Sequence, residues 1–190
     1  MKYETKKIGD TEYFLINLRQ REAELRIMED MDNGVDVYYD RRWEVTEVMA
    51  EWLEGNRDIY QGKRVLVLGA GVGFETIVLG KYASKLYIND LSPTALALCS
   101  EQLLKNGVFG SEMLLGRYED IHLPEVDLIV ASFLVYNTET LGAMRAFMKE
   151  NHCDFILMNG TLPDFSICLS ELSHELIFEM EDSMCVLFKK

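Results

Sequence analysis

Three glycines at alternate positions and an aspartate downstream are the residues of this chain whose types and spacing most clearly indicate chemistry. The glycines are Gly69, Gly71 and Gly73, and Asp90 follows 21 positions after the first of them. Glycine lets a backbone turn tightly and approach a ligand closely, and a helix that begins at such a turn offers unpaired N–H groups. In nucleotide-binding α/β folds, an acid about 20 residues after the first glycine binds the ribose hydroxyls. The pattern therefore predicts a nucleoside-binding site.

A predicted strand, turn, helix and second strand hold these residues in place. The apolar run Val65–Leu68 is typical of a strand buried on both faces, and a helical pattern begins at Phe74. A second short strand, Leu86–Ile88, ends just before Asp90. This unit places the glycines and the carboxylate at neighbouring strand ends, where open α/β sheets bind their ligands. A turn that only packs a helix onto a sheet needs fewer glycines, so we favour ligand binding.

The position of the third glycine separates the candidate cofactors. The dinucleotide fingerprint G-x-G-x-x-G/A needs a small residue five positions after the first glycine, but Phe74 occupies that position. The Gly-Lys-Ser/Thr of a mononucleotide P-loop is missing as well. The spacing G-x-G-x-G, followed by D-L-S-P from Asp90, resembles the seven-stranded S-adenosylmethionine-dependent methyltransferases. This resemblance implies S-adenosylmethionine as cofactor and S-adenosylhomocysteine as product, with the glycines under the methionine part and Asp90 on the ribose.

The composition limits the function further. A chain of 190 residues with 48% hydrophobic content suits one domain, and its net charge of −13 argues against a nucleic-acid partner. The four cysteines and three histidines are scattered, so we predict no metal site and the reduced thiols of a cytoplasmic protein. No secretory segment and no run of membrane-spanning length is present, so no membrane association is expected.

A tryptophan–acid pair and a second motif narrow the resemblance. Trp43-Glu44 precedes an apolar helix predicted over residues 45–54, and G-K-R-V-L over residues 62–66 leads toward the glycine turn. Over about residues 36–137 the chain resembles methyltransferase family 16, which includes protein-lysine methyltransferases, the electron-transfer-flavoprotein-β type and predicted nicotinamide N-methylases. The resemblance implies that Trp43 lies beside the cofactor. The alternative is a large hydrophobic anchor at a helix start.

We expect a Rossmann-like, doubly wound α/β domain with a small N-terminal extension. The extension, residues 1–40, consists of a β-hairpin and a charged helix whose sparse apolar side carries Leu25 and Met28. The methyltransferase domain, residues 41–190, contains a seven-stranded sheet that is mostly parallel with an antiparallel last strand. Its strands are predicted at 65–68, 86–88, 113–115, 127–132, 155–158, 176–180 and 184–188, and its further helices at 93–105, at 138–150 and up to about 172.

Two more strand-end residues are expected beside the cofactor. Tyr118 lies in the loop that borders the adenine in the resembling enzymes and can stack on the base, although a half-exposed loop tyrosine is the alternative. Ser132 ends the fourth strand, whose tip should face the transferred methyl group. The expected cofactor-binding residues are Trp43, Gly69, Ala70, Gly71, Gly73, Asp90, Leu91, Tyr118 and Ser132.

The acceptor site departs from the family pattern. The family carries Asp-x-x-Tyr at the end of the fourth strand to bind or orient the acceptor nitrogen, and Phe133 stands here in place of that aspartate. The tyrosine is retained as Tyr136, so the catalytic candidates are Tyr136 and Asn137, with Glu139 as a substitute acid one turn later. A strand-end aromatic that caps the core is the alternative for Tyr136.

Two further departures concern the cofactor site. Val67 stands where many methyltransferases have an acid that orders the methionine end, and Glu75 or Glu44 is available to compensate. Arg117 stands where relatives often present an acid to the adenine amine. Together these changes lower the expected turnover more than the expected cofactor binding.

The leading hypothesis is an S-adenosylmethionine-dependent methyltransferase, N-directed, acting on a small molecule or on a protein side chain such as lysine. The alternative is a non-catalytic S-adenosylmethionine-binding or interaction module with a degenerate methyltransferase fold, which the departures motivate. A nicotinamide-dinucleotide oxidoreductase is disfavoured by Phe74 and by the shifted third glycine. A tRNA or DNA methyltransferase is disfavoured by the net charge and by the lack of an Asn-Pro-Pro-Tyr segment.

Overall fold

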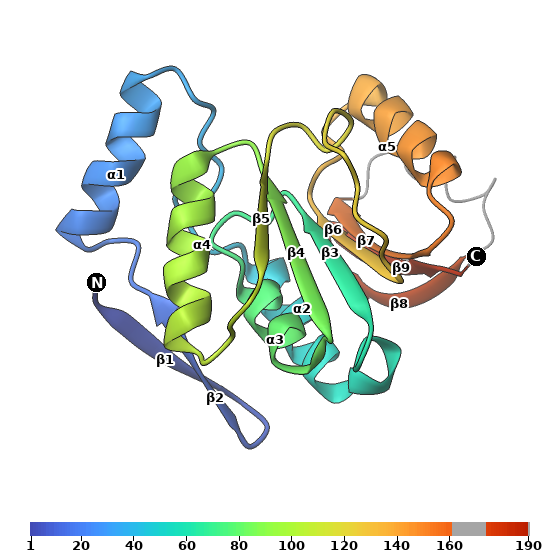
Figure 1. Ribbon diagram of the computed structural model, residues 1–190, viewed down its shortest axis with the longest axis horizontal. Coiled ribbons are helices and arrows are strands. Elements are labelled where there is room, and N and C mark those ends of the chain that lie inside the picture. The colour runs from blue at the N-terminus through green and yellow to red at the C-terminus, as the bar shows by residue number, and fades with distance from the viewer. Residues whose placement is uncertain (161–173, 190) are drawn as a thin grey trace.

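A seven-stranded sheet forms the centre of the protein in a computed structural model that describes residues 1–160 and 174–189 (Figure 1). Its strands are β3 (Arg64–Leu68), β4 (Lys85–Asp90), β5 (Glu112–Leu115), β6 (Leu128–Ser132), β7 (Asp154–Gly160), β8 (Glu175–Met180) and β9 (Ser183–Phe188). The spatial order is β5-β4-β3-β6-β7-β9-β8, and β9 runs antiparallel between β7 and β8 while the other neighbours pair in parallel. The predicted Rossmann-like sheet with an antiparallel last strand is confirmed.

The strand order reverses at β3. From β3 the chain proceeds outward through β4 to β5, and it then returns to the other side of β3 to form β6 and β7. Such a switch point leaves a crevice at the carboxyl ends of the two central strands, because the connections leave it in opposite directions. The glycine turn follows β3 directly, so the sequence places it at this crevice.

The two faces of the sheet bury alternate side chains of the same strands. Val65 and Val67 of β3 pack in the cluster formed with α2 (Glu44–Gly55), α3 (Phe74–Tyr82) and α4 (Pro93–Lys105). Leu66 and Leu68 pack in the cluster formed with α5 (Thr138–Glu150) on the opposite face. A strand buried on both faces has no polar side to alternate with, which explains the continuous apolar run in the sequence.

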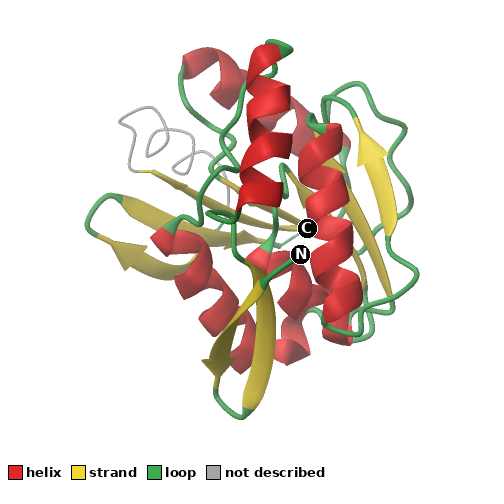
Figure 2. Cartoon of the chain, turned by 90° about the vertical axis from the view of Figure 1, so that its left-hand side faces the viewer, coloured by secondary structure: helices red, strands yellow, loops and turns green. Residues whose placement is uncertain are grey.

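The N-terminal extension forms a hairpin and a helix on the α4 side of the sheet (Figures 1 and 2). The hairpin pairs β1 (Tyr3–Ile8) with β2 (Thr11–Ile16) in an antiparallel two-stranded sheet, and α1 (Arg21–Asp32) follows. The expected apolar side of this helix is wrong, because Leu25 and Met28 are each more than half exposed. The helix instead buries Ala23, Ile27 and Asp30.

Most predicted elements agree with the structure to within one or two residues at each end, but two expectations lie outside the described residues. The helix expected up to about residue 172 and Cys168 both fall within 161–173. The other cysteines, Cys99, Cys153 and Cys185, are buried, and Cys99 and Cys185 are free thiols. In the described part of the chain, no helix combines the length and the apolar composition needed to cross a membrane.

Candidate active site

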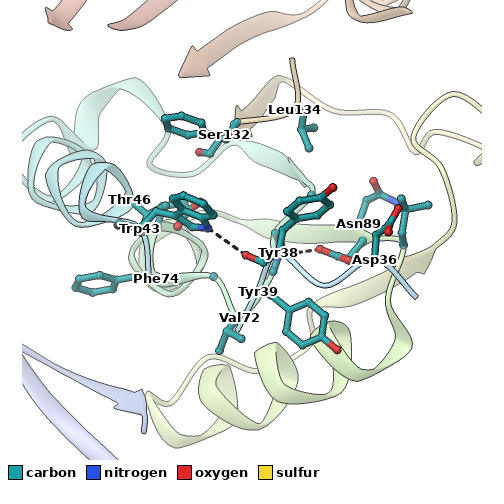
Figure 3. Close-up of a pocket in the computed structure, with 18 of the residues that line it drawn as sticks. Asp36, Tyr38, Tyr39, Trp43, Thr46, Val72, Phe74, Asn89, Ser132 and Leu134 are labelled. Carbon is teal, nitrogen blue, oxygen red and sulfur yellow. Dashed lines mark hydrogen bonds between the residues drawn. The ribbon is translucent and has the colours of Figure 1, made fainter. Parts of the chain in front are cut away.

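A cavity of about 850 Å³ opens at the carboxyl ends of β3, β4 and β6 (Figure 3). Its walls come from the glycine turn, the tips of these strands, the loop after β5 and the segment that precedes α2. Every predicted cofactor-binding residue lines it, and so does Tyr136, whereas Asn137 does not. The structure therefore brings together residues spread over most of the chain at the place where the strand order predicts a ligand.

The glycine turn has no room for side chains at two of its positions. All three glycines have a left-handed backbone, with φ between 54° and 63°, a conformation that other residues rarely adopt. A Cβ atom at Gly69 would lie 2.4 Å from Leu134 Cδ2, and one at Gly73 would lie 2.5 Å from Thr76 Oγ1. The turn thus presents backbone directly to the cavity and ends at the N-terminus of α3.

Asp90 sits at the tip of β4 and is tied to the glycine turn. Its Oδ2 accepts a hydrogen bond from the Gly71 N–H at 2.8 Å, and its Oδ1 accepts one from the Ser92 N–H at 2.9 Å. Burial raises the pKa of Asp90 above its usual value, although these backbone donors oppose the shift. Leu91, beside it on the wall of the cavity, is 63% exposed and leaves this end open to solvent. The carboxylate is held in place and remains accessible from the cavity.

Glu75 supplies a second acid at the floor of the cavity. It lies in the first turn of α3 and is only 3% exposed, and burial raises its pKa to about 7 despite a hydrogen bond with Ser132. Val67 stands where many methyltransferases have an acid, and here it is buried in the core and does not line the cavity. Glu44 is exposed and does not line it either. Of the two acids suggested as compensation, Glu75 is the one in position.

The far end of the cavity carries the residues expected near an adenine. Tyr118 packs edge-on against Phe147, with ring centroids 5.1 Å apart, and burial raises the pKa of Tyr118 to about 12. Arg117 is exposed, and its Nη2 lies 3.1 Å from Glu119 Oε1. Glu119 therefore supplies an acid at this end of the cavity, although Arg117 occupies the position where an acid was expected. Stacking of Tyr118 on a base remains a prediction.

The near end of the cavity is aromatic. Trp43 and Phe133 lie almost parallel, with ring centroids 6.2 Å apart, and Tyr38 and Tyr136 form a second stacked pair at 5.7 Å. The Arg41 guanidinium lies 4.6 Å from the centre of the Trp43 ring, at the distance of a cation–π contact. The Trp43 indole N–H donates to the Tyr38 carbonyl at 3.1 Å, which holds the segment before α2 over the cavity (Figure 3).

Phe133 adopts a backbone conformation that suits the aspartate it replaces. Its φ is 55°, and asparagine and aspartate enter this left-handed region more readily than other residues with a side chain. Its N–H donates to the Met158 carbonyl at 2.8 Å, so the strand-end geometry is fixed by the sheet. The backbone at the end of β6 is therefore one that aspartate would adopt readily, and an aromatic residue occupies it here.

Asn137 and Glu139 belong to the start of α5. The Asn137 Oδ1 accepts a hydrogen bond from the Thr140 N–H at 3.0 Å, and Thr140 completes the capping box by accepting from the Asn137 N–H. Glu139 is exposed and does not line the cavity. In this structure Asn137 serves as a helix cap, and its catalytic role remains a prediction without a position in the cavity.

Several lining residues were not singled out from the sequence. Asn89 donates from its Nδ2 to the carbonyls of Leu114 and Gly116, which fixes the loop after β5. Gln102 connects the Val72 carbonyl to the Ile16 N–H, and so joins the glycine turn to the hairpin. Further lining residues of this kind include Asp36, Tyr38, Tyr39, Thr46 and Glu119.

Comparisons with known proteins agree with this geometry. Residues 19–159 match the model of a family described as lysine methyltransferase. The chain is 26% identical over 126 residues to a protein-lysine N-methyltransferase of Chaetomium thermophilum, covering 58% of this chain and 37% of that protein. It is 25% identical over 117 residues to the human electron transfer flavoprotein beta subunit lysine methyltransferase, covering 60% of this chain and 44% of that protein.

Solved structures share the fold at low identity. A ribosomal protein L11 methylase of Lactobacillus delbrueckii superposes with a TM-score of 0.63 at 20% identity, covering 79% of this chain and 81% of that one. A TehB-like SAM-dependent methyltransferase of Corynebacterium glutamicum superposes with a TM-score of 0.57 at 16% identity, covering 89% of this chain and 96% of that one. The chain spans less than half the length of the curated relatives it matches. The chain belongs to the lysine methyltransferase family, whose cofactor is S-adenosylmethionine.

Proposed function

We propose that the protein is an S-adenosylmethionine-dependent N-methyltransferase that acts on a lysine side chain of a protein substrate. The observation that carries this proposal is the junction of two kinds of surface in one cavity. One end has the glycine turn with Asp90, and the other has the aromatic residues at the tip of β6. Family membership favours lysine over other acceptors.

The residues present fit S-adenosylmethionine. A cavity of about 850 Å³ is within the usual range for cofactor sites, and the glycine turn presents backbone without side chains to it. Asp90 would hold the ribose hydroxyls, and Glu75 would hold the ammonium of the methionine part in place of the acid missing at position 67. When bound, the cofactor supplies a methyl group on a sulfonium for in-line transfer to a nucleophile.

The protein's own part in the reaction is to align the acceptor and keep it uncharged. An unperturbed lysine has a pKa of about 10.4, and it must lose its proton before it can attack. Removal of water from an ammonium between these rings would favour the neutral amine. Holding the two reactants in line can contribute about 7–11 kcal/mol to the lowering of the barrier.

The remaining expectations from the sequence stay part of the proposal. A small-molecule acceptor is the second candidate, because the aromatic residues replace the carboxylate that would recognise lysine. We further propose a cytoplasmic protein without a nucleic-acid partner, which its net charge of −13 and the buried free thiols of Cys99 and Cys185 support. The non-catalytic binding module remains the alternative from another class.

Titration with S-adenosylhomocysteine, followed by methyl transfer from labelled cofactor to cell proteins, tests the proposal. We expect micromolar binding, and a loss of about 1.5–3 kcal/mol in Asp90→Ala, the scale of a hydrogen bond to a charged group. Label on lysine of a protein, absent with Asp90→Ala, would support the enzyme. Binding without any labelled product would favour the non-catalytic module, and no binding to the wild type would refute both.

A further inference from the structure

A buried carboxylate behind the cavity connects three segments of the chain. Asp30, on α1, is 6% exposed and is not among the residues that line the cavity. Its Oδ2 accepts hydrogen bonds from the Tyr39 hydroxyl at 2.5 Å and the Ser92 hydroxyl at 2.6 Å. Its Oδ1 accepts a third from the Thr94 hydroxyl at 2.7 Å. Burying a charge is costly, so three donors on one carboxylate indicate that this arrangement is strongly specified.

The first connection leads to the glycine turn through Tyr39. This tyrosine is 6% exposed, lines the cavity and packs with Val72 of the turn. A Cβ atom at Gly71 would lie 3.4 Å from Tyr39 Cβ, so Tyr39 lies beside the turn at this glycine. Burial, reinforced by the hydrogen bond to Asp30, raises the pKa of Tyr39 to about 12, and the hydroxyl stays a donor. Asp30 thereby fixes the residue that lies over the middle of the turn.

The second connection leads to Asp90 through Ser92. The Ser92 hydroxyl donates to Asp30 and accepts from the Ala95 N–H at 2.9 Å, as the cap of α4. The Ser92 N–H donates to Asp90 at 2.9 Å. Because Asp90 also accepts from the Gly71 N–H, the contacts form a closed circuit through Asp30, Tyr39, the glycine turn, Asp90 and Ser92.

The charge of Asp30 also reaches the site. Burial opposes ionisation of Asp30, but the hydrogen bonds from Ser92, Tyr39 and Thr94 hold its pKa below the usual value. The carboxylate lies at the N-terminus of α4, where a negative charge is stabilised. Burial, and in smaller part the charge of Asp30, raises the pKa of Asp90.

We propose that Asp30 is a positioning residue of the cofactor site. It holds Tyr39 over the glycine turn and Ser92 beside Asp90, so that the N-terminal extension, proposed as residues 1–40, contributes to a site whose other lining residues lie after residue 40. The inference rests on the proposed function, because it takes the turn and Asp90 as contacts of S-adenosylmethionine.

A second buried carboxylate supplies a matched control. Glu54, on α2, is 7% exposed and accepts hydrogen bonds from the Thr11 and Tyr13 hydroxyls, each at 2.6 Å. It joins the hairpin to the domain as Asp30 joins α1, but neither Glu54 nor Tyr13 lines the cavity. Tyr39→Phe and Tyr13→Phe each remove one hydroxyl from a buried tyrosine–carboxylate pair, and only the first of these pairs has a member that lines the cavity.

The test compares Tyr39→Phe, Tyr13→Phe and Asp30→Asn with the wild type. For each protein we would measure the Kd for S-adenosylhomocysteine by calorimetry, the urea unfolding midpoint, and amide hydrogen exchange over residues 35–43. We expect Tyr39→Phe to weaken binding about fivefold and Asp30→Asn at least tenfold, with faster exchange over residues 35–43. Tyr13→Phe should lose comparable stability but bind within twofold of the wild type.

The outcomes separate this inference from the proposed function. If Asp30→Asn and Tyr39→Phe bind S-adenosylhomocysteine with the same Kd as the wild type, the positioning role is overturned and the proposed function stands. Equal losses in Tyr39→Phe and Tyr13→Phe would overturn it too, because the effect would then follow stability alone. If the wild type does not bind S-adenosylhomocysteine, the proposed function fails. Unchanged amide exchange over residues 35–43 in Asp30→Asn would show that Asp30 does not hold the segment that carries Tyr39, and would overturn the positioning role. Should Asp30→Asn not fold, Tyr39→Phe still decides between these outcomes.

Discussion

The two ends of the cavity are built in different ways. At the end proposed to bind the cofactor (the cofactor end), the glycine turn and Asp90 come from one stretch of 22 residues, Gly69 to Asp90, and their positions follow from a strand, a turn, a helix and a strand. At the end proposed to bind the methyl acceptor (the acceptor end), Tyr38 and Trp43 come from the segment before α2, while Phe133 and Tyr136 follow β6. The cofactor end presents backbone and carboxylates, and the acceptor end presents rings. This difference is what one expects if a common cofactor constrains one end and a particular substrate the other.

The largest expected effect concerns the buried acid at the cofactor end. Glu75 has a pKa of about 7 in the folded protein against an ordinary 4.5, so the folded state holds the proton more tightly than the unfolded chain. The contribution of protonated Glu75 to the free energy of unfolding is complete below pH 4.5, is lost as the pH rises to 7 and stays lost at higher pH. At 1.36 kcal/mol per pKa unit this loss is about 3 kcal/mol. Glu75→Gln should therefore be more stable than the wild type at pH 8 by about that amount, with the difference shrinking below about 1 kcal/mol near pH 5.

Urea unfolding at several pH values measures this effect. Glu54→Gln is the control, because hydrogen bonds from Thr11 and Tyr13 and the Arg57 ion pair hold the pKa of Glu54 below its usual value, against the effect of burial. That substitution should destabilise the protein at pH 8, the opposite sign. A stability difference between Glu75→Gln and the wild type that does not change with pH would contradict the assignment. Loss of affinity for S-adenosylhomocysteine in the more stable Glu75→Gln would identify the acid as a functional rather than a structural group.

Steric crowding at the turn gives the next largest effect. Gly73→Ala places a Cβ 2.5 Å from Thr76 Oγ1 and 3.2 Å from Cys99 Sγ, in a left-handed backbone. We expect a loss of about 2–3 kcal/mol in the free energy of unfolding, from backbone strain and from the contacts together. Gly107→Ala has the same backbone strain with nothing within 4 Å of the new Cβ, so it should cost about 1–2 kcal/mol. Equal losses in the two variants would show that the turn is not crowded.

The contrast between the two ends also explains what the sequence could predict. Spacing rules apply within one unit, so the glycines, Asp90 and the order of elements were accessible from a single stretch. Tyr38, Asp36 and Thr46 line the cavity only because the segment before α2 folds over it, and no local periodicity encodes such a contact. The apolar face predicted for α1 was wrong for a related reason. The buried face of this helix includes Asp30, whose polarity is satisfied by Tyr39, Ser92 and Thr94 from elsewhere in the chain.

At the acceptor end, restoring the family carboxylate should have a modest effect on stability. Phe133→Asp loses the contact with Trp43, worth about 0.5–1.5 kcal/mol, but aspartate tolerates a φ of 55° better, so the net change should stay within about 1 kcal/mol. The new carboxylate should strengthen binding of a lysine peptide by up to about 1 kcal/mol relative to Phe133→Asn, which has the same backbone preference without the charge. Peptide titration in the presence of S-adenosylhomocysteine measures this. Tighter peptide binding in both variants would attribute the gain to space rather than charge.

The smallest effect on stability is expected at Tyr136, and it separates the two interpretations of that residue. Tyr136 is 52% exposed and its ring lies against Tyr38, a contact that phenylalanine keeps. Tyr136→Phe should therefore change the free energy of unfolding by less than about 0.5 kcal/mol. Partial burial raises the pKa of Tyr136, so near neutral pH its hydroxyl can donate or accept a hydrogen bond but cannot act as a base. If it orients the acceptor nitrogen, Tyr136→Phe lowers kcat about 10- to 100-fold while the Kd for S-adenosylhomocysteine is unchanged. If the ring only caps the core, kcat is retained in Tyr136→Phe, and the acceptor end is then defined by its aromatic faces alone.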